Sequence, residues 1–168
     1  TGDVQSNLSP GIYTITITDS VLLCTSETTI SVPEAILPMF TLMSSSVTCF
    51  GDNTGAFDIN VNGYSGPYTY EVFDNLGVSV VGPVNANTST NPLTVTGMPA
   101  GTFNVVITET DSPFCSTSGT VVINSPSDTL ALTASETSNV SCDDSQGIIT
   151  ALASGGWGDY EYELSGDA

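Results

Sequence analysis

The sequence contains no lysine, no arginine and no histidine, yet 18 of its 168 residues are aspartate or glutamate. Without histidine, the usual general base and the usual zinc ligand are missing, and imidazole-dependent catalytic triads are excluded. Without lysine or arginine, no side chain can neutralise nucleic-acid phosphates or an anionic membrane surface. Solvent, metal ions or other molecules must therefore balance the net charge of −18. These absences favour a passive extracellular structural module over an enzyme.

Long hydrophobic runs and leader sequences are also missing. No stretch approaches the ~20 apolar residues of a membrane-spanning helix, and no basic-apolar leader is present, so we expect any export signal to lie outside this sequence. The hydrophobic fraction of 39% is nevertheless sufficient for a folded core. Because lysine and arginine are absent, trypsin has no cleavage site in the chain.

An internal repeat organises the chain. Residues 8–19 resemble residues 97–108, and residues 47–55 resemble residues 140–147. The matched glycines give an offset of 101 − 11 = 90, and the matched cysteines of the second pair give 142 − 49 = 93. The sequence therefore predicts one structural unit of about 91–93 residues that occurs more than once.

Three units are expected, of which the middle one is complete. Residues 1–34 form the C-terminal half of one repeat, residues 35–125 a whole repeat, and residues 126–168 the N-terminal half of the next. This arrangement predicts a segment of a longer array. The connections at 31–35 and 124–128 are short, so we expect neighbouring units to touch.

Apolar side chains alternate with polar ones throughout these units. The alternating apolar positions are Tyr13, Ile15 and Ile17; Phe57, Ile59 and Val61; Tyr68, Tyr70 and Val72; and Phe103, Val105 and Ile107. A period of two is typical of antiparallel strands with one wet face, and glycine and proline mark the strand boundaries. We predict an all-β fold of tandem immunoglobulin-like antiparallel β-sandwich repeats, with about seven strands in the complete unit and no helix.

The four cysteines are Cys24, Cys49, Cys115 and Cys142. In an immunoglobulin-like strand order Cys49 ends the first strand and Cys115 opens the last, so they lie at opposite ends of the sandwich. That separation exceeds the ~5.5 Å between the Cα atoms of a disulfide. We expect disulfides between units, from the Cys49 position of one repeat to the Cys115 position of the next. Pairs within a unit and free buried thiols stay open as alternatives, whereas zinc is not expected without CxxC spacing.

Acidic residues gather in turns at the predicted unit ends. If stacked units bring two such turns together, an oxygen-rich calcium site results. Its candidate ligands are Asp52, Asp111, Asp143 and Asp144. The alternative is that these residues only form turns through local side-chain-to-backbone hydrogen bonds. No DxDxDG loop is present, and no other cofactor is expected.

Two further patterns have a functional and a simpler structural interpretation. Glu161 and Glu163 share one face of a predicted strand, but they point away from the tyrosines, so a role as solvent-exposed surface residues is favoured over a glycosidase pair. Aromatic side chains could form a sugar-stacking platform, although tyrosines in strand phase are more often core. These aromatic residues are Tyr68, Tyr70, Trp157, Tyr160 and Tyr162.

The order of motifs resembles the SprB-type repeat of very long cell-surface adhesins in gliding Bacteroidota. The resemblance is carried by residues 47–55, by Gly63, by residues 67–70, by residues 99–103 and by Cys115, and 142–162 repeats its first half. Departures are mild. Phe50 and Asp143 replace a small polar residue after cysteine, Asp159 replaces the proline before Tyr160, and Leu22-Leu23 precedes Cys24 where the family usually has Asn-Gly.

The resemblance implies a protein exported by the type IX secretion system and displayed as a filament that is moved along the cell surface. It also implies O-glycosylation at Asp-Ser/Thr-apolar triplets. Two such triplets are present, and they place the modified residues at Ser20 and Thr129.

Together these features predict a structural segment of an extracellular adhesin filament for surface adhesion and gliding motility. The expected partners are adjacent repeats of the same chain, a surface polysaccharide or substratum, and secretion and motility machinery outside this segment. No nucleic acid and no membrane span are expected. Two other functions stay open, namely a carbohydrate-binding β-sandwich module and a self-assembling surface fibre whose half units from adjacent chains complete one another.

Overall fold

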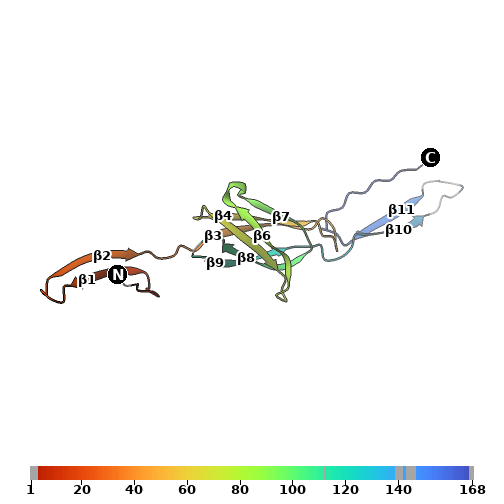
Figure 1. Ribbon diagram of the computed structural model, residues 1–168. Helices are drawn as coiled ribbons and strands as arrows, with labels where there is room; N and C mark the ends of the chain where they lie inside the picture. The colour runs from red at the N-terminus through yellow and green to blue at the C-terminus, as the bar shows by residue number, and fades with distance from the viewer. Residues whose placement is uncertain (1–3, 112, 139–141, 143–146, 167–168) are drawn as a thin grey trace. The chain divides into compact units, whose positions relative to one another are not determined.

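The computed structural model describes residues 4–111, 113–138, 142 and 147–166 (Figure 1). The chain divides into two compact units, Thr1–Leu37 and Pro38–Ala168. The first contains one β-hairpin, and the second contains a complete β-sandwich followed by a second hairpin. The fold is therefore all-β, as the alternating pattern predicts. Within the described residues no helix is long or apolar enough to cross a membrane.

Two antiparallel sheets face each other in the central sandwich. Their strands are β3 (Met39–Ser45), β4 (Gly55–Asn62), β5 (Pro67–Phe73), β6 (Ser79–Asn87), β7 (Leu93–Met98), β8 (Gly101–Glu109) and β9 (Ser116–Ile123). One sheet has the order β3-β4-β7 and the other the order β6-β5-β8-β9. A single 3₁₀ turn, η1 (Thr88–Thr90), follows β6. The predicted seven-stranded immunoglobulin-like plan is confirmed.

The hydrophobic core lies between these two sheets. Its buried members are Val47, Phe57, Ile59, Val61, Tyr68, Tyr70, Val72, Val95, Met98, Phe103, Val105, Ile107, Val121 and Ile123. They occupy alternate positions along β4, β5 and β8, because successive side chains of a strand point to opposite faces. The edge strand β6 supplies no fully buried residue to this core.

The first and last strands of the sandwich lie side by side and run in the same direction. Gly119 of β9 packs on Phe40 of β3 so closely that a Cβ atom there would lie 3.0 Å from the ring. Farther along, the Val47 amide donates a hydrogen bond to the Asn124 carbonyl oxygen at 3.0 Å. The chain therefore enters at the start of β3 and leaves past the end of β9, at opposite ends of the sandwich.

The N-terminal hairpin repeats the geometry of β8 and β9. It consists of β1 (Gly11–Thr18) and β2 (Thr25–Val32). Gly11 pairs with Val32 as Gly101 pairs with Ile123, and this register continues along both hairpins. The turn before the hairpin matches as well, because Asn7 has φ 61° where Gly97 has φ 78°. Asparagine tolerates this left-handed conformation better than most residues.

The second hairpin repeats the geometry of β3 and β4. It consists of β10 (Ala131–Ser138) and β11 (Ile148–Ser154). Leu132 pairs with Ala153 as Phe40 pairs with Val61, an offset of 92 in both strands (132 − 40 and 153 − 61). The repeat detected in the sequence is therefore a repeat of strand pairing.

Two details of the sequence prediction are wrong. The predicted strand around Tyr160–Leu164 is irregular, so Glu161 and Glu163 do not share the face of a strand. The equivalent strand β5 pairs with β6 on one side and β8 on the other, whereas no strand among the described residues pairs with residues 160–164. A strand without neighbours cannot satisfy its backbone hydrogen bonds within a sheet. In addition, β3 ends at Ser45, so Cys49 lies in the following turn and not at the strand end.

Candidate functional site

The cysteines lie at the ends of the units. All four are free thiols; Cys24, Cys49 and Cys142 are exposed, and Cys115 is half-buried. Cys49 follows Val47, which is bonded to the residue after β9, whereas Cys115 immediately precedes β9. The eight-residue strand β9 separates them by roughly 25 Å at ~3.3 Å per residue. A Cys49–Cys115 disulfide within the repeat is incompatible with this geometry, and the disulfide between repeats stays a prediction.

The predicted calcium ligands are divided between the two ends in the same way. Asp52 lies in the turn after Cys49, and Asp111 lies in the turn between β8 and β9. Asp143 and Asp144 lie outside the described residues. Among the residues that the structure describes, no three acidic or thiol side chains come together in a geometry suited to a metal ion. The calcium site expected where turns of two successive repeats meet stays a prediction.

A buried carboxylate, Glu109, closes the turn that contains Asp111. Glu109 is almost completely buried, and its Oε2 accepts a hydrogen bond from the Cys115 amide at 3.2 Å. The Glu109 amide donates in turn to the Cys115 carbonyl oxygen at 2.9 Å. Glu109 was not among the residues predicted from the sequence to have a role. The alternation along β8 could have indicated its burial, because Glu109 stands two residues after the core residue Ile107 and points to the same side of the strand.

Burial and the acidic residues of the same turn also raise the pKa of a nearby phenol, that of Tyr64. Tyr64 donates a hydrogen bond to the Pro67 carbonyl oxygen at 2.9 Å. Its pKa is raised, first by burial and then by the negative charges of Glu109 and Asp111. This end of the sandwich therefore disfavours additional negative charge, as expected for a surface without any lysine or arginine.

The first glycosylation candidate, Ser20, lies exposed in the β1–β2 turn. The Asp19 carboxylate accepts hydrogen bonds from the amides of Leu22 and Val21 at 2.9 and 2.7 Å. These bonds lower the pKa of Asp19. Because Asp19 organises the turn, the Asp-Ser-Val triplet has a structural reason to exist even without a glycan.

The second glycosylation candidate, Thr129, is also exposed. Its amide donates to Asp128 Oδ1 at 2.9 Å, and the Asp128 carbonyl oxygen accepts from the Gly156 amide at 3.0 Å. Thr129 therefore lies against the glycine turn after β11. Glycosylation at Ser20 and Thr129 stays a prediction.

The suggested tyrosine platform is divided by the fold. Tyr68 and Tyr70 are core residues and cannot stack on a sugar. Tyr160 and Tyr162 are more exposed, and each makes a local bond: Tyr160 donates to the Gly155 carbonyl oxygen at 2.5 Å, and Tyr162 Oη accepts from the Ala153 amide at 3.0 Å. The prediction of a sugar-stacking surface is therefore wrong for Tyr68 and Tyr70.

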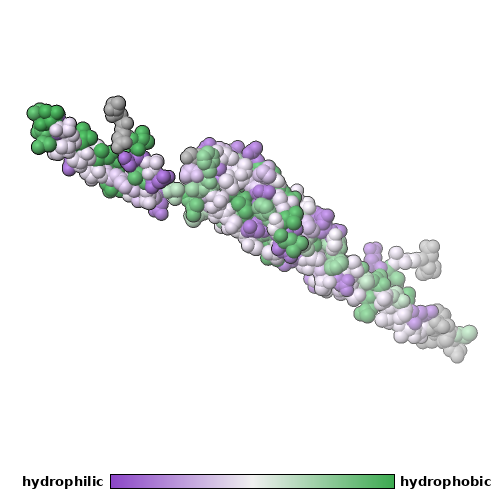
Figure 2. All heavy atoms as spheres, turned by 60° about the horizontal axis from the view of Figure 1, so that its bottom comes forward, coloured by the Kyte–Doolittle hydropathy of each residue, from purple (hydrophilic) through white to green (hydrophobic). Residues whose placement is uncertain are grey.

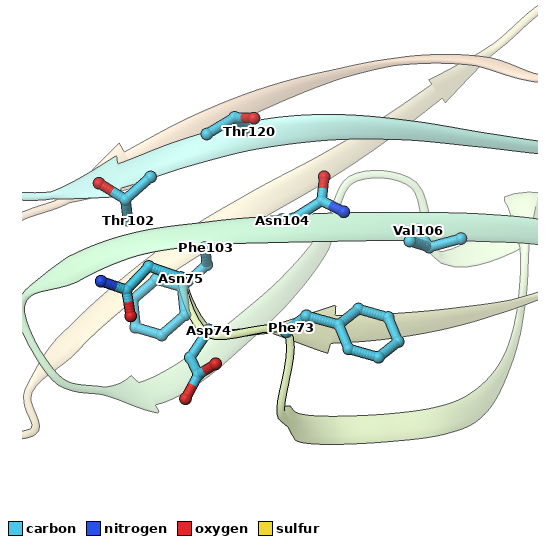
Figure 3. Close-up of a pocket in the computed structure, with 9 residues that line it drawn as sticks. Phe73, Asp74, Asn75, Thr102, Phe103, Asn104, Val106 and Thr120 are labelled. Atoms are coloured by element: carbon cyan, nitrogen blue, oxygen red, sulfur yellow. The ribbon is translucent and has the colours of Figure 1, made fainter.

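A surface depression lies at one end of the four-stranded sheet. Figure 3 shows its lining, where Phe73, Asp74 and Asn75 adjoin outward-facing residues of β8 and β9. It is open, with a volume of about 520 Å³. Asp74 Oδ1 accepts the amides of Leu76 and Val78 at 2.9 and 2.8 Å, so this carboxylate holds the β5–β6 turn together. The arrangement contains no catalytic constellation among the described residues.

A contact between successive repeats involves the chain's single tryptophan. The Trp157 indole N–H, from the turn after β11, donates to the Thr48 carbonyl oxygen at 3.0 Å. The indole stays 54% exposed. Thr48 is itself fixed, because its amide donates to Thr54 Oγ1 at 2.7 Å. The turn that carries Cys49 and Asp52 therefore meets the following repeat, which is the kind of junction that the disulfide and calcium predictions require.

We expect Trp157→Phe to loosen this turn, because phenylalanine keeps an aromatic ring but cannot donate the hydrogen bond. The loss of about 1 kcal/mol for one such bond corresponds to roughly fivefold faster exchange. The readout is the hydrogen-exchange rate of the Asp52 amide, which donates to the Cys49 carbonyl oxygen in this turn. Leu164→Ala, at an exposed residue of the same partial repeat, serves as the control. Unchanged exchange in Trp157→Phe would contradict the role of the contact.

The chain matches a known repeat family at two places, and the spacing of these matches agrees with the repeated strand register. The SprB repeat model matches residues 41–76 and residues 134–168. The two matches begin 134 − 41 = 93 residues apart and end 168 − 76 = 92 residues apart, in agreement with the register of β3–β4 and β10–β11. No significant match was found among curated proteins or among solved structures. The matches lie in the front half of the repeat, and the chain therefore contains two SprB-type repeat segments.

Proposed function

We propose that the chain is a structural segment of a long extracellular adhesin filament that serves surface adhesion and gliding. The observation that carries this proposal is the repetition of strand register at a constant offset, together with two SprB repeat matches at the same spacing. Proteins built this way are quasi-one-dimensional, with each unit contacting its neighbours. The proposed units are 1–34, 35–125 and 126–168.

The architecture supports a load-bearing role. The chain enters and leaves the central sandwich at opposite ends, so pulling on the chain loads the sandwich along its strands. The core of the central repeat is complete within residues 47–123. We propose no catalytic role, and the proposed partners are the neighbouring repeats, a surface polysaccharide or substratum, and the type IX export and motility machinery.

Surface display is the first test of this proposal. Antibodies raised against the 168-residue chain should label intact cells of the source bacterium, and they should reduce attachment and gliding. Labelling that requires permeabilised cells would contradict an extracellular filament. Normal attachment and gliding after deletion of the coding sequence would contradict the motility role.

The negative charge predicts a salt-dependent stiffness of the filament. With a net charge of −18 per 168 residues and no cationic side chain, neighbouring repeats repel one another, and salt screens that repulsion. We expect filaments in electron micrographs to be straighter at about 0.01 M salt, where the Debye length is ~30 Å, than at about 1 M, where it is ~3 Å. Equal curvature at both salt concentrations would show that repulsion does not control stiffness.

A further inference from the structure

The first and last strands of the central repeat are placed so that tension acts along both of them. The chain enters the sandwich at the start of β3 and leaves it past the end of β9. The two strands run in the same direction, because Phe40 packs on Gly119 near the entry and Val47 is bonded to Asn124 near the exit. Tension on the chain therefore pulls β3 and β9 past each other, parallel to their axes.

Each of these two strands is bonded to a neighbour along its whole length. Seven residue pairs join β3 to β4, and eight pairs join β9 to β8. Neither ladder contains a register irregularity, whereas the β4–β7 and β5–β6 ladders are both interrupted. The hydrogen bonds of an antiparallel ladder are perpendicular to the strands. A pull along the strand therefore loads all bonds of the ladder together, whereas a pull that separates one end would load them one at a time.

A direct contact joins the two strands at the exit end. The Val47 amide donates a hydrogen bond to the Asn124 carbonyl oxygen at 3.0 Å, and the side chains of Val47 and Ile123 are both buried. Gly55 leaves the space that these side chains fill, because a Cβ atom there would lie 2.6 Å from Ile123 Cγ2 and 3.3 Å from Val47 Cγ1. Sliding of the strands would therefore break this bond and drag two buried side chains out of the core.

At the entry end, apolar packing holds β3 against β9. A Cβ atom on Gly119 would lie 3.0 Å from the Phe40 ring and 3.5 Å from Leu42 Cδ1, so both side chains fit against the β9 backbone. Phe40 and Leu42 are half-buried and pack against the hydrophobic core. Hydrophilic and neutral residues predominate on the visible face of the central repeat (Figure 2), since the apolar sides of its strands face inward. Displacing β3 therefore exposes apolar surface as well as breaking hydrogen bonds.

The buried carboxylate of Glu109 anchors the other end of β9. Its Oε2 accepts a hydrogen bond from the Cys115 amide at 3.2 Å, and the Glu109 amide donates to the Cys115 carbonyl oxygen at 2.9 Å. Cys115 immediately precedes β9, so these bonds hold the end of the strand opposite to the end that is pulled. Sliding of β9 must break them together with the ladder.

We infer that β3 and β9, with the contacts at their ends, form a mechanical clamp that makes the central repeat resist tension along the chain. The observation that carries this inference is that both terminal strands are pulled lengthwise while an uninterrupted ladder holds each of them. Forced unfolding is governed by the unfolding rate and not by the equilibrium stability, so this resistance is distinct from the stability of the core. Its use in a filament rests on the proposed function, whereas the clamp itself does not.

The test is single-molecule force spectroscopy of the 168-residue chain in two pulling geometries. With handles at both chain ends, unfolding of the central repeat releases the 85 residues from Met39 to Ile123 (123 − 39 + 1), which is roughly 250–300 Å of chain at ~3.3–3.6 Å per residue. The second geometry moves one handle from the C-terminus to the exposed residue Ser65, through an azide-bearing amino acid. Because Met39 pairs with Asn62 at that end of the ladder, this geometry opens β3–β4 one pair at a time. We expect a several-fold higher unfolding force in the end-to-end geometry, and equal forces would overturn the inference.

Two matched variants separate the clamp from general stability. Phe40→Ala removes packing between β3 and β9, whereas Val81→Ala removes a side chain of β6 that packs against the same core outside the two pulled strands. A position that stays intact in the transition state leaves the unfolding rate unchanged, even when its substitution lowers the equilibrium stability. Under constant end-to-end force, we expect Phe40→Ala to unfold about tenfold faster or more, and Val81→Ala to stay within about twofold of the original chain. Equal acceleration in both variants would overturn the clamp.

These experiments distinguish failure of the clamp from failure of the proposed function. A repeat that unfolds at the same force in both geometries would overturn the clamp and leave the results of surface labelling and attachment unchanged. Normal gliding of cells that lack the chain would contradict the filament role, whereas a difference in force between the two geometries would still support the clamp.

Discussion

Phe57→Ala is expected to lower the free energy of unfolding of the central repeat by about 3–5 kcal/mol. Phe57 is 1% exposed and lies in the middle of the core formed by the two sheets. Its removal loses the transfer free energy of an aromatic ring and leaves a cavity that rigid strands cannot close. Because a typical domain is stable by only about 5–15 kcal/mol, the variant should be close to its folding limit.

The measurement is chemical denaturation of the 168-residue chain, at dilutions where it is monomeric. Phe114→Ala is the matched control, because Phe114 lies in a turn of the same repeat and is 63% exposed. We expect the control to change stability by less than about 0.5 kcal/mol. Similar losses in both variants would mean that the sandwich is not held together by its inter-sheet core.

Alkaline pH is expected to unfold the central repeat, with Tyr68 as a major cause. Tyr68 is fully buried, and its hydroxyl is the one buried side-chain polar atom without a hydrogen-bond partner in the described part of the chain. Burial, and then the charge of Tyr70, raises the pKa of Tyr68 above its ordinary value of 10.0. The stability linked to this group is therefore complete below pH 10 and is lost as the pH rises toward the folded-state pKa. The slope is up to about 1.4 kcal/mol per pH unit for one proton.

Tyr68→Phe separates this contribution from other alkaline effects. The variant keeps the ring and removes the hydroxyl, so the slope of stability above pH 10 should become shallower, with the part due to Tyr64 remaining. At neutral pH the variant should be as stable as the original chain or more stable by about 1 kcal/mol, since a buried unpaired hydroxyl is lost. Denaturation curves of the central repeat at pH 7 and above pH 10 measure both effects. Tyr162→Phe lies outside the central core and should leave these curves unchanged; an equal pH slope in Tyr68→Phe would exclude Tyr68 as the cause.

Much of the fold was predictable from side-chain periodicity. Phe57, Ile59 and Val61 alternate with polar residues, and this pattern correctly gave both the strand and its buried face. The repeat offset was equally informative, because residues that match along the sequence also match in strand register. Both signals are local, so they do not depend on which strands become neighbours.

Local periodicity could not predict which strands, distant in the sequence, contact one another. The alternation of Ile15 and Ile17 is as regular as that of Val105 and Ile107, yet only the second pair is buried, because burial requires an opposing sheet. Tyr160 and Tyr162 repeat the pattern of Tyr68 and Tyr70 without forming a strand, and no strand among the described residues pairs with them.

The amino-acid sequence by itself determined the all-β class, the length of the repeat and the absence of any cationic side chain, since these follow from composition and local periodicity. The tertiary structure alone decided which apolar faces are covered, which end of the sandwich carries Cys49 and which carries Cys115, and where Trp157 meets the preceding repeat. These features depend on strand order and on parallel contact between the first and last strands, which bring together residues far apart in the chain. A periodic pattern specifies which side of a strand avoids water, but only the assembled sheets determine what that side meets.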